Sequence, residues 1–138
     1  FDAEKFKTEC RRILKPNGKI ALIWNMRSME DSLNRDWHSV FKEFCHEFHG
    51  FSNGISENDD KIRLFFDSFE KTEFQSPIPM DKTAFLQRSL SSSYSLTEKD
   101  NNFREYTEEL NRIFNLYCDD TGTVSIKNKT TLYIGTIK

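Results

Sequence analysis

Residues 14–27 of this chain are Leu14-Lys15-Pro16-Asn17-Gly18-Lys19-Ile20-Ala21-Leu22-Ile23-Trp24-Asn25-Met26-Arg27. The proline stops a helix, and the Asn17-Gly18 pair after it can take the left-handed backbone conformation of a tight turn. The run from Ile20 to Trp24 is apolar at every position, which is typical of a short strand covered on both faces. We therefore predict a middle strand of a parallel sheet, with a polar exit at its carboxyl end.

Amphipathic helices are predicted on both sides of this strand. The first begins after Asp2, a good N-cap, and carries an apolar face made of Ala3, Phe6, Cys10, Ile13 and Leu14. The second ends near Gly50 and carries the apolar stripe Leu33, Trp37, Val40, Phe41, Phe44, Cys45 and Phe48. A helix, a strand and a helix in this order form one winding unit of a sheet, so we predict an α/β fold.

The rest of the chain is predicted to complete the sheet and to insert helices into it. The expected elements are a helix over 56–66 capped by Ser56, a strand over 69–75 closed by Pro77 and Pro79, a helix capped by Asp81, a long helix from Thr97, and a β-hairpin of 123–126 with 130–137. We predict a single domain over 1–138. Within it, 1–76 and 123–138 form the sheet core with flanking helices, and 77–122 form a helical insertion or lid.

Composition limits the possible partners and the compartment. Lys and Arg number 20 against 22 Asp and Glu, so the chain has no basic field that would attract nucleic acid or an anionic membrane. No apolar run approaches the ~20 residues of a membrane span. The three cysteines are far apart and odd in number, which is typical of reduced thiols in a cytoplasmic protein. The 13 Phe residues predict an aromatic-rich core.

Two short motifs resemble a known enzyme family. Arg12-Ile13-Leu14-Lys15-Pro16-Asn17-Gly18 is similar to the Arg-x-Leu-Lys-Pro-Gly-Gly turn that enters the fifth strand of class I S-adenosylmethionine-dependent methyltransferases, with Asn17 in place of the first glycine. Leu90-Ser91-Ser92-Ser93-Tyr94 is similar to a Ser-x-Ser-Tyr element placed after the sixth strand. The chain looks most like the C-terminal half of the methyltransferase type 11, trans-aconitate methyltransferase-like branch.

The resemblance implies a Rossmann-like sheet, a small-molecule substrate and an S-adenosylmethionine cofactor. The family holds this cofactor with a glycine-rich loop after its first strand, and the five glycines here form no such cluster. The chain, which begins at Phe1 without an initiator methionine, is then expected to be a fragment that carries the substrate side and is inactive alone. Phe1 would lie near the cofactor. The strand would leave one edge open, so we expect homo-oligomers through that edge.

Six residues are candidates for substrate binding. They are Trp24, Asn25 and Arg27 at the strand exit, and Ser92, Ser93 and Tyr94 in the serine-rich segment. The Arg27 guanidinium could hold a carboxylate through two parallel hydrogen bonds, and the serine-rich segment could hydrogen-bond a polar substrate from a lid. The plain alternatives are a core tryptophan, a solvated arginine and a flexible loop. No catalytic residue is predicted, because methyl transfer mainly needs an aligned substrate and excluded water.

Other functions remain open. A non-catalytic interaction domain could recruit a partner strand to the open sheet edge, and a different doubly wound enzyme could share only the winding. A metal site is considered at His38, Cys45, His46 and His49, because His46 and His49 are three residues apart on the predicted helix. No further ligand completes an established spacing, so we predict a surface pair and no metal.

Overall fold

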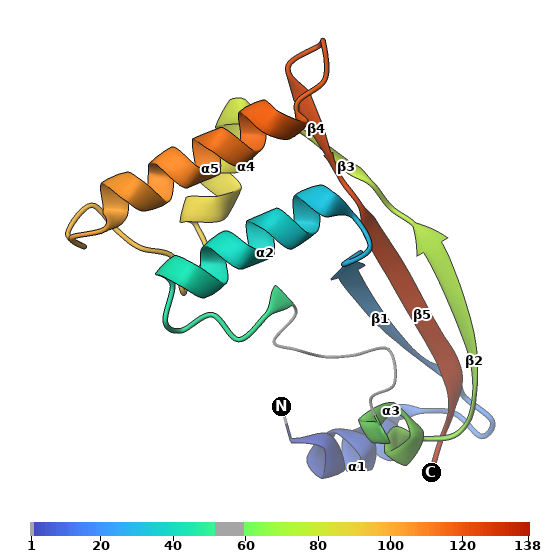
Figure 1. Cartoon of the computed structure of the whole chain (residues 1–138). Coiled ribbons are helices and arrows are strands. Elements are labelled where there is room, and N and C mark those ends of the chain that lie inside the picture. The colour runs from blue at the N-terminus through green and yellow to red at the C-terminus, as the bar shows by residue number, and fades with distance from the viewer. Residues whose placement is uncertain (1, 52–59) are drawn as a thin grey trace. The chain divides into compact units, whose positions relative to one another are not determined.

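The computed structural model describes residues 2–51 and 60–138 and shows an α/β structure with antiparallel sheets (Figure 1). Its elements are α1 (Ala3–Ile13), β1 (Ile20–Arg27), α2 (Ser32–Phe44), α3 (Asp60–Phe65), β2 (Phe66–Gln75), β3 (Ile78–Asp81), α4 (Lys82–Leu90), α5 (Phe103–Tyr117), β4 (Thr123–Ile126) and β5 (Asn128–Ile137). The chain divides into two compact units. Unit 1 comprises 1–25, 55–74 and 130–138, and unit 2 comprises 26–54 and 75–129.

The larger sheet has the order β1-β5-β2, with the last strand of the chain in the middle. Ser28 N, just after β1, donates to Lys127 O, just before β5, at 2.9 Å. Lys138 N, just after β5, donates to Phe65 O, just before β2, at 3.3 Å. Each of these two hydrogen bonds joins the end of one strand to the start of another, so β5 runs antiparallel to both of its neighbours.

The prediction of a parallel strand covered on both faces is wrong for the described residues, because β1 is antiparallel to β5 and exposes one face. β1 pairs on one side only, with β5. Ile20, Leu22 and Trp24 pack on the core of unit 1. Ala21 and Ile23 alternate with them and are exposed, Ile23 by 63%. A continuous apolar run does not distinguish one covered face from two, because side chains alternate between the faces of any strand.

The predicted hairpin of 123–126 with 130–137 does not form. β4 pairs instead with β3, in the register Ile78↔Ile126 and Asp81↔Thr123, and β5 belongs to the other sheet. Only Lys127 separates β4 from β5. One residue is too short for the chain reversal of a hairpin, whose commonest connections have about two residues. The polar turn expected at this point is therefore a junction between two sheets.

Local signals at the start of the chain are confirmed in part. Asp2 Oδ1 accepts hydrogen bonds from Glu4 N and Lys5 N, both at 3.1 Å, as an N-cap does. Asn17 has a φ of 63° and closes the turn after α1. The apolar face predicted for this helix is incompletely covered, because Ile13 is 61% exposed.

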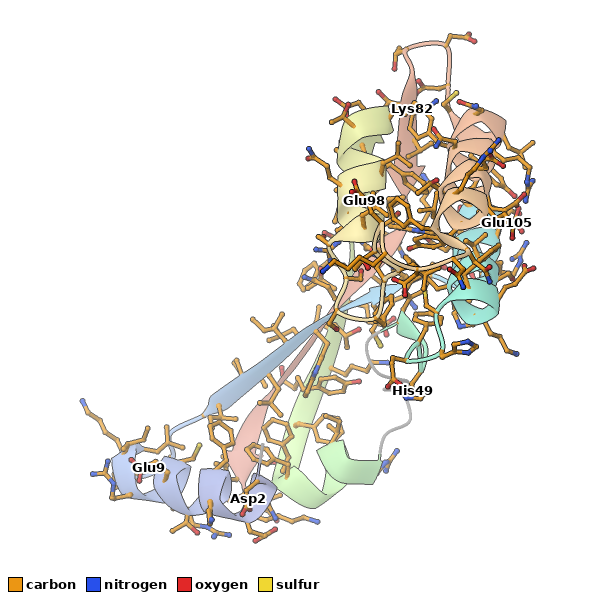
Figure 2. The ribbon with its side chains drawn as sticks, turned by 90° about the vertical axis from the view of Figure 1, so that its left-hand side faces the viewer. Asp2, Glu9, His49, Lys82, Glu98 and Glu105 are labelled. Carbon is orange, nitrogen blue, oxygen red and sulfur yellow. The ribbon has the colours of Figure 1, made fainter. Side chains whose placement is uncertain are left out.

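The core of unit 1 is small and aromatic. Phe65, Phe66 and Tyr133 are buried in it. Trp24 of β1 meets Tyr133 of β5 edge-on, with ring centroids 5.7 Å apart. Phe6 of α1 stacks on Phe65 of α3 at 5.6 Å, and the two helices lie close together in both Figure 1 and Figure 2. Ring contacts therefore attach both helices and β1 to the central strand.

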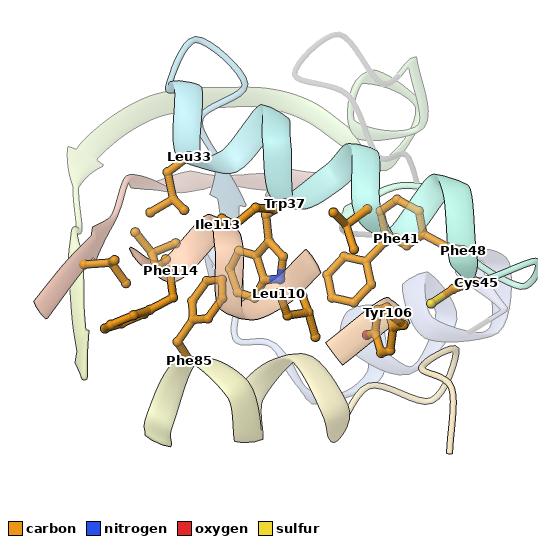
Figure 3. Packing of buried hydrophobic residues seen from close by; sticks show 13 residues of the cluster. Leu33, Trp37, Phe41, Cys45, Phe48, Phe85, Tyr106, Leu110, Ile113 and Phe114 are labelled. Carbon is orange, nitrogen blue, oxygen red and sulfur yellow. The ribbon is translucent and has the colours of Figure 1, made fainter. Parts of the chain in front are cut away.

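In unit 2, α2, α4 and α5 pack around a larger core, and Figure 3 shows its side chains between these helices. Trp37 and Phe41 of α2 are fully buried, as is Phe85 of α4. Trp37 Nε1 donates to Ser89 Oγ at 3.0 Å, so the buried indole N–H is satisfied. The prediction of an aromatic-rich core is confirmed in this unit.

Two predicted helix bounds in unit 2 are wrong. α2 ends at Phe44 instead of near Gly50, although Phe48 stays buried beyond its end. α5 begins at Phe103 instead of Thr97. Thr97 N and Oγ1 donate to Asp100 Oδ2 at 2.7 and 2.8 Å, and this side-chain turn competes with the helix. Apolar spacing does not locate such ends, because a turn can bury the same side chains.

Two further caps were predicted. Asp81 is confirmed as the N-cap of α4, because its Oδ1 accepts a hydrogen bond from Ala84 N at 2.8 Å. The cap predicted at Ser56 lies outside the described residues, and the described helix in this region is α3. The strand at 69–75 is confirmed as the main part of β2, while Pro79 lies within β3.

The packing of β5 on β2 predicts a large effect of one methyl group. A Cβ atom added to Gly135 would overlap the Ser68 carbonyl oxygen and lie 2.8 Å from Phe69 Cα. Backbone atoms cannot rotate away, so we expect Gly135→Ala to lower the free energy of unfolding by about 1–3 kcal/mol. Urea denaturation followed by circular dichroism measures this change.

The matched control is Ala21→Val, which adds carbon atoms at an exposed position of the same sheet. We expect its free energy of unfolding to stay within about 0.5 kcal/mol of the wild-type value. Equal unfolding midpoints for the two variants would contradict the close approach of β5 to β2.

Candidate functional site

The most unusual charged group in unit 2 is the half-buried guanidinium of Arg27, the last residue of β1. Its Cζ lies 4.0 Å from the ring centroid of Trp37 and 4.0 Å from that of Phe51. The two centroids are 5.8 Å apart, so the rings meet the cation from directions nearly at right angles. Arg27 therefore lies in an aromatic corner, which attracts the cation through the ring quadrupoles.

The backbone after Arg27 is held by a buried amide. Asn34 is fully buried on α2, and its Nδ2 donates to Ser28 O at 2.9 Å and to Lys127 O at 2.8 Å. Asp31 caps this helix, because its Oδ2 accepts a hydrogen bond from Asn34 N at 3.1 Å. The sequence Asp31-Ser32-Leu33-Asn34 thus begins the helix and anchors the strand exit with one turn.

Burial changes the electrostatics of Arg27. Burial, opposed by Tyr94 and reinforced by the Arg88 cation, lowers the pKa of the Arg27 guanidinium to about 10. The side chain therefore remains positively charged at neutral pH. Such a cation is normally paired when it is removed from water.

No such pairing is present among the described residues. Within 2–51 and 60–138, no carboxylate lies within salt-bridge distance of Arg27, and no hydrogen bond of its guanidinium is found. The aromatic rings offer it no hydrogen-bond acceptor. A guanidinium carries five N–H donors in one plane, and a carboxylate can accept two of them in parallel. The corner is therefore suited to binding a small carboxylate.

Tyr94 is brought to the same unit by the serine-rich segment after α4. Its ring packs against Phe41 with centroids 5.1 Å apart and against Phe48 at 4.9 Å. Phe41 and Phe48 in turn contact the Phe51 ring of the corner, with centroids 6.0 and 5.4 Å away. The structure thus joins two of the six candidates, Arg27 and Tyr94, through one aromatic cluster.

The two serines before Tyr94 have smaller roles in the described structure. Ser92 Oγ donates to Arg88 O at 3.5 Å, and Ser93 is exposed. Ser95, which is not among the six candidates, has its Oγ 3.0 Å from the phenol oxygen of Tyr106. The hydroxyl that ties this segment to the core is therefore the one that follows Tyr94.

The remaining candidates belong to unit 1 or lie outside the described residues. Trp24 packs on Tyr133, and Asn25 Oδ1 accepts a hydrogen bond from Thr130 Oγ1 at 2.7 Å. Phe1 is outside the described part of the chain. The exit of β1 therefore contributes its candidates to two different units, with only Arg27 in the larger one.

Three residues of the corner were missed as site residues. The apolar spacing predicts only a core position for Trp37, and no role is predicted from the sequence for Phe51 or Asn34. Helical spacing correctly predicts that Trp37 is buried, but it does not show that a cation from a strand contacts the ring. Asn34 interrupts the apolar side of α2 as a fully buried polar residue, and such an interruption is a usable signal in hindsight.

Gly18, Gly122 and Gly135 lie apart from one another in the described part of the chain. Gly18 lies in the turn after α1, and Gly135 is mid-strand against β2. Gly122 has a φ of 74° in the turn before β4, and no described atom lies within 4 Å of the position that a Cβ atom would take there. These three glycines are in separate turns and strands, so they offer no shared loop for close backbone approach to a ligand.

A metal site is not supported by the described part of the chain. No group of three or more His, Cys, Asp or Glu side chains there is arranged to hold a metal ion. The assignment of His46 and His49 to one helix is wrong, because α2 ends at Phe44. Figure 2 shows His49 in the segment beyond this helix.

Comparison with protein-family models finds no family that matches this chain, and comparison with curated proteins finds no significantly similar sequence. Among the described residues, no helix is long and apolar enough to cross a membrane.

His38, next to the aromatic corner, predicts a pH dependence of stability. Its ring meets Phe48 and Phe51 edge-on, at 5.0 and 5.5 Å. Burial lowers the pKa of His38 below its ordinary value, and the Lys42 cation lowers it further. The unfolded chain then binds this proton more readily than the folded one. We expect the free energy of unfolding to fall as the pH drops below ~6.5, the ordinary histidine pKa.

Urea denaturation at several pH values, from neutral to mildly acidic, measures this dependence. His38→Gln is the control, since it keeps a polar side chain of similar reach but removes the titration. We expect the loss of stability on acidification to be smaller in this variant than in wild type. Identical pH profiles would show that His38 does not contribute.

Proposed function

We propose that this chain forms the substrate-binding side of an S-adenosylmethionine-dependent methyltransferase that acts on a small carboxylate. The observation that carries the proposal is the Arg27 guanidinium, which is half-buried in an aromatic corner and has no carboxylate partner among the described residues. Desolvation strengthens an interaction between such a cation and an anionic ligand. A carboxylate that enters the corner would satisfy both the charge and the N–H donors.

Three further features support this proposal. The strand exit that carries Arg27 is followed by a helix, as in α/β proteins, which bind ligands at the carboxyl ends of strands. The final strand is antiparallel, in agreement with the antiparallel ending that the methyltransferase resemblance implies. The segment similar to the Ser-x-Ser-Tyr element places Tyr94 in the same aromatic cluster as Trp37.

In this proposal, the chain's own residues bind and orient the substrate. Arg27 holds the carboxylate, and the Tyr94 phenol offers a neutral donor or acceptor beside it. The rings of Trp37 and Phe51 exclude water from one side of the site. The cofactor supplies the methyl group when bound, and its binding falls to residues other than those described, which form no glycine-rich cradle.

Carboxylate binding by the corner is tested with trans-aconitate and benzoate, each compared with its neutral methyl ester. We expect both acids, but neither ester, to shift amide and indole resonances of unit 2 in nuclear magnetic resonance spectra. Arg27→Gln should weaken acid binding by roughly 10- to 100-fold, because a hydrogen bond to a charged group is worth about 1.5–3 kcal/mol.

Arg104→Gln is the matched control for this experiment. Arg104 is exposed on α5 and pairs with Glu108, with its Nε 2.8 Å from Glu108 Oε1. Loss of its charge should leave the dissociation constants unchanged. Equal affinities for the acids and their esters, or equal loss in both variants, would contradict carboxylate binding at Arg27. Methyl transfer from radiolabelled S-adenosylmethionine to the bound acid, by the protein of the complete reading frame, tests the reaction itself.

A second candidate function is a protein-interaction domain that uses the edge of β1. In the described residues, this strand has a neighbour on one side only. Its residues from Ile20 to Met26 carry no charge, and Ile23 is 63% exposed. Charged side chains, prolines or bulges normally protect such an edge from pairing with another strand.

Self-association through this edge is tested by sedimentation velocity at increasing protein concentration. We expect the wild-type chain to form dimers at high concentration and Ile23→Lys to reduce them, because a charge on an edge strand opposes strand pairing. Ile13→Lys is the control, since Ile13 is similarly exposed, by 61%, but lies on α1. A wild-type chain that stays monomeric would exclude this interaction.

A further inference from the structure

Tyr106 places a hydroxyl at the base of the segment that carries Tyr94. It lies on α5, is fully buried, and its phenol oxygen is 3.0 Å from Ser95 Oγ. Ser95 follows Tyr94 directly, and Ser95 N donates to Ser92 O at 2.9 Å. The bond between Tyr106 and Ser95 therefore joins the core of unit 2 to a turn, not to a helix or strand.

Apolar contacts hold the segment on both sides of that bond, since Leu96 also packs against the core of unit 2. The Tyr94 ring packs on Phe41 and Phe48, and such apolar contacts are tolerant of small displacements. A hydrogen bond is directional and weakens steeply when its geometry changes. Ser95 is the residue of the segment whose side chain reaches a buried hydroxyl of another element. Its bond to Tyr106 therefore fixes where the turn begins to leave the core.

We propose that Tyr106 is a positioning residue of the carboxylate site, acting through Ser95 on Tyr94. The inference rests on the proposed function, since it concerns the affinity of the same site. Tyr106 does not touch the ligand. Its hydroxyl holds the turn from which the Tyr94 ring packs on Phe48, and Phe48 in turn contacts Phe51 of the aromatic corner.

The hydroxyl of Tyr106 can be removed without disturbing the packing around it. Its ring contacts Phe41 and Phe44, with centroids 6.3 and 5.8 Å away, and phenylalanine keeps that ring. Ser95 Oγ has an alternative partner in Leu96 O at 3.3 Å. Loss of the phenol hydroxyl therefore releases the turn without a large cavity, and the main effect is on the position of the segment.

The structure offers a matched control on the same helix. The Tyr117 hydroxyl donates to Asp36 Oδ2 at 2.7 Å, so Tyr117→Phe also removes one interhelical hydrogen bond of unit 2. That bond joins α5 to α2 and does not involve the serine-rich segment. Both substitutions should lower the unfolding midpoint slightly, but only Tyr106→Phe should change ligand binding.

The experiment measures trans-aconitate affinity and the ring resonances of Tyr94 in isotope-labelled protein. We expect Tyr106→Phe to raise the dissociation constant roughly fivefold, within the range of one lost hydrogen bond, and to shift the Tyr94 resonances. Ser95→Ala should have the same two effects, and the two substitutions should be less than additive in the double variant, because both remove the Tyr106–Ser95 bond. Tyr106→Phe also removes an interaction of the hydroxyl with the Cys45 side chain. Tyr117→Phe should leave the affinity and the Tyr94 resonances unchanged.

Failure of this inference differs from failure of the proposed function. If the wild-type chain binds the acid and Tyr106→Phe binds it equally well, the positioning role is wrong and the carboxylate site stands. If Tyr117→Phe weakens binding as much as Tyr106→Phe, the effect is one of stability, and the positioning role is again wrong. If the wild-type chain does not bind the acid at all, both are wrong.

Discussion

The side-chain amide of Asn34 holds together the part of the structure on which the candidate site depends. One nitrogen donates to two carbonyls that are far apart in sequence, Ser28 O after β1 and Lys127 O before β5. The amide is fully buried, so losing these bonds would leave its N–H donors unpaired away from water, at a cost of about 1–3 kcal/mol. This constraint determines where the chain leaves β1 and therefore where Arg27 lies.

The aromatic cluster of unit 2 serves both stability and the site. Trp37 fills the core with its ring and satisfies its N–H on Ser89, while it also contacts the Arg27 cation. A ring can do both because its edge and its face interact with different partners. Most of the burial comes from the helices, whereas the charge comes from the end of a strand. The site thus requires a helix, which supplies the Trp37 ring, and the end of a strand, which supplies the Arg27 cation.

The methyltransferase interpretation and the interaction-domain interpretation rely on different parts of the chain. The first depends on Arg27 and Tyr94 in unit 2. The second depends on the open edge of β1, whose exposed residue Ile23 belongs to unit 1. Because they depend on residues of different units, Arg27→Gln tests the first interpretation and Ile23→Lys tests the second.

Local signals were read correctly from sequence where the interaction is between near neighbours. The caps at Asp2 and Asp81 and the left-handed turn at Asn17 depend on residues within a few positions. The apolar stripe that contains Trp37 also follows from helical spacing. Predictions failed where the outcome depends on distant partners, as for the pairing of β4 with β3 instead of β5.

The sequence by itself determined the α/β class, the buried face of α2 and the presence of a cation at the strand exit, because propensity, periodicity and residue type act locally. Only the tertiary structure decided that β5 lies between β1 and β2 and that Arg27 meets Trp37 and Phe51. Strand order and ring contacts join residues far apart along the chain, and no local pattern encodes which distant partner is chosen. The segment from Leu14 to Arg27 contains one example of each kind. Its turn follows from the local backbone preference of Asn17, whereas the aromatic environment of Arg27 depends on residues far along the chain.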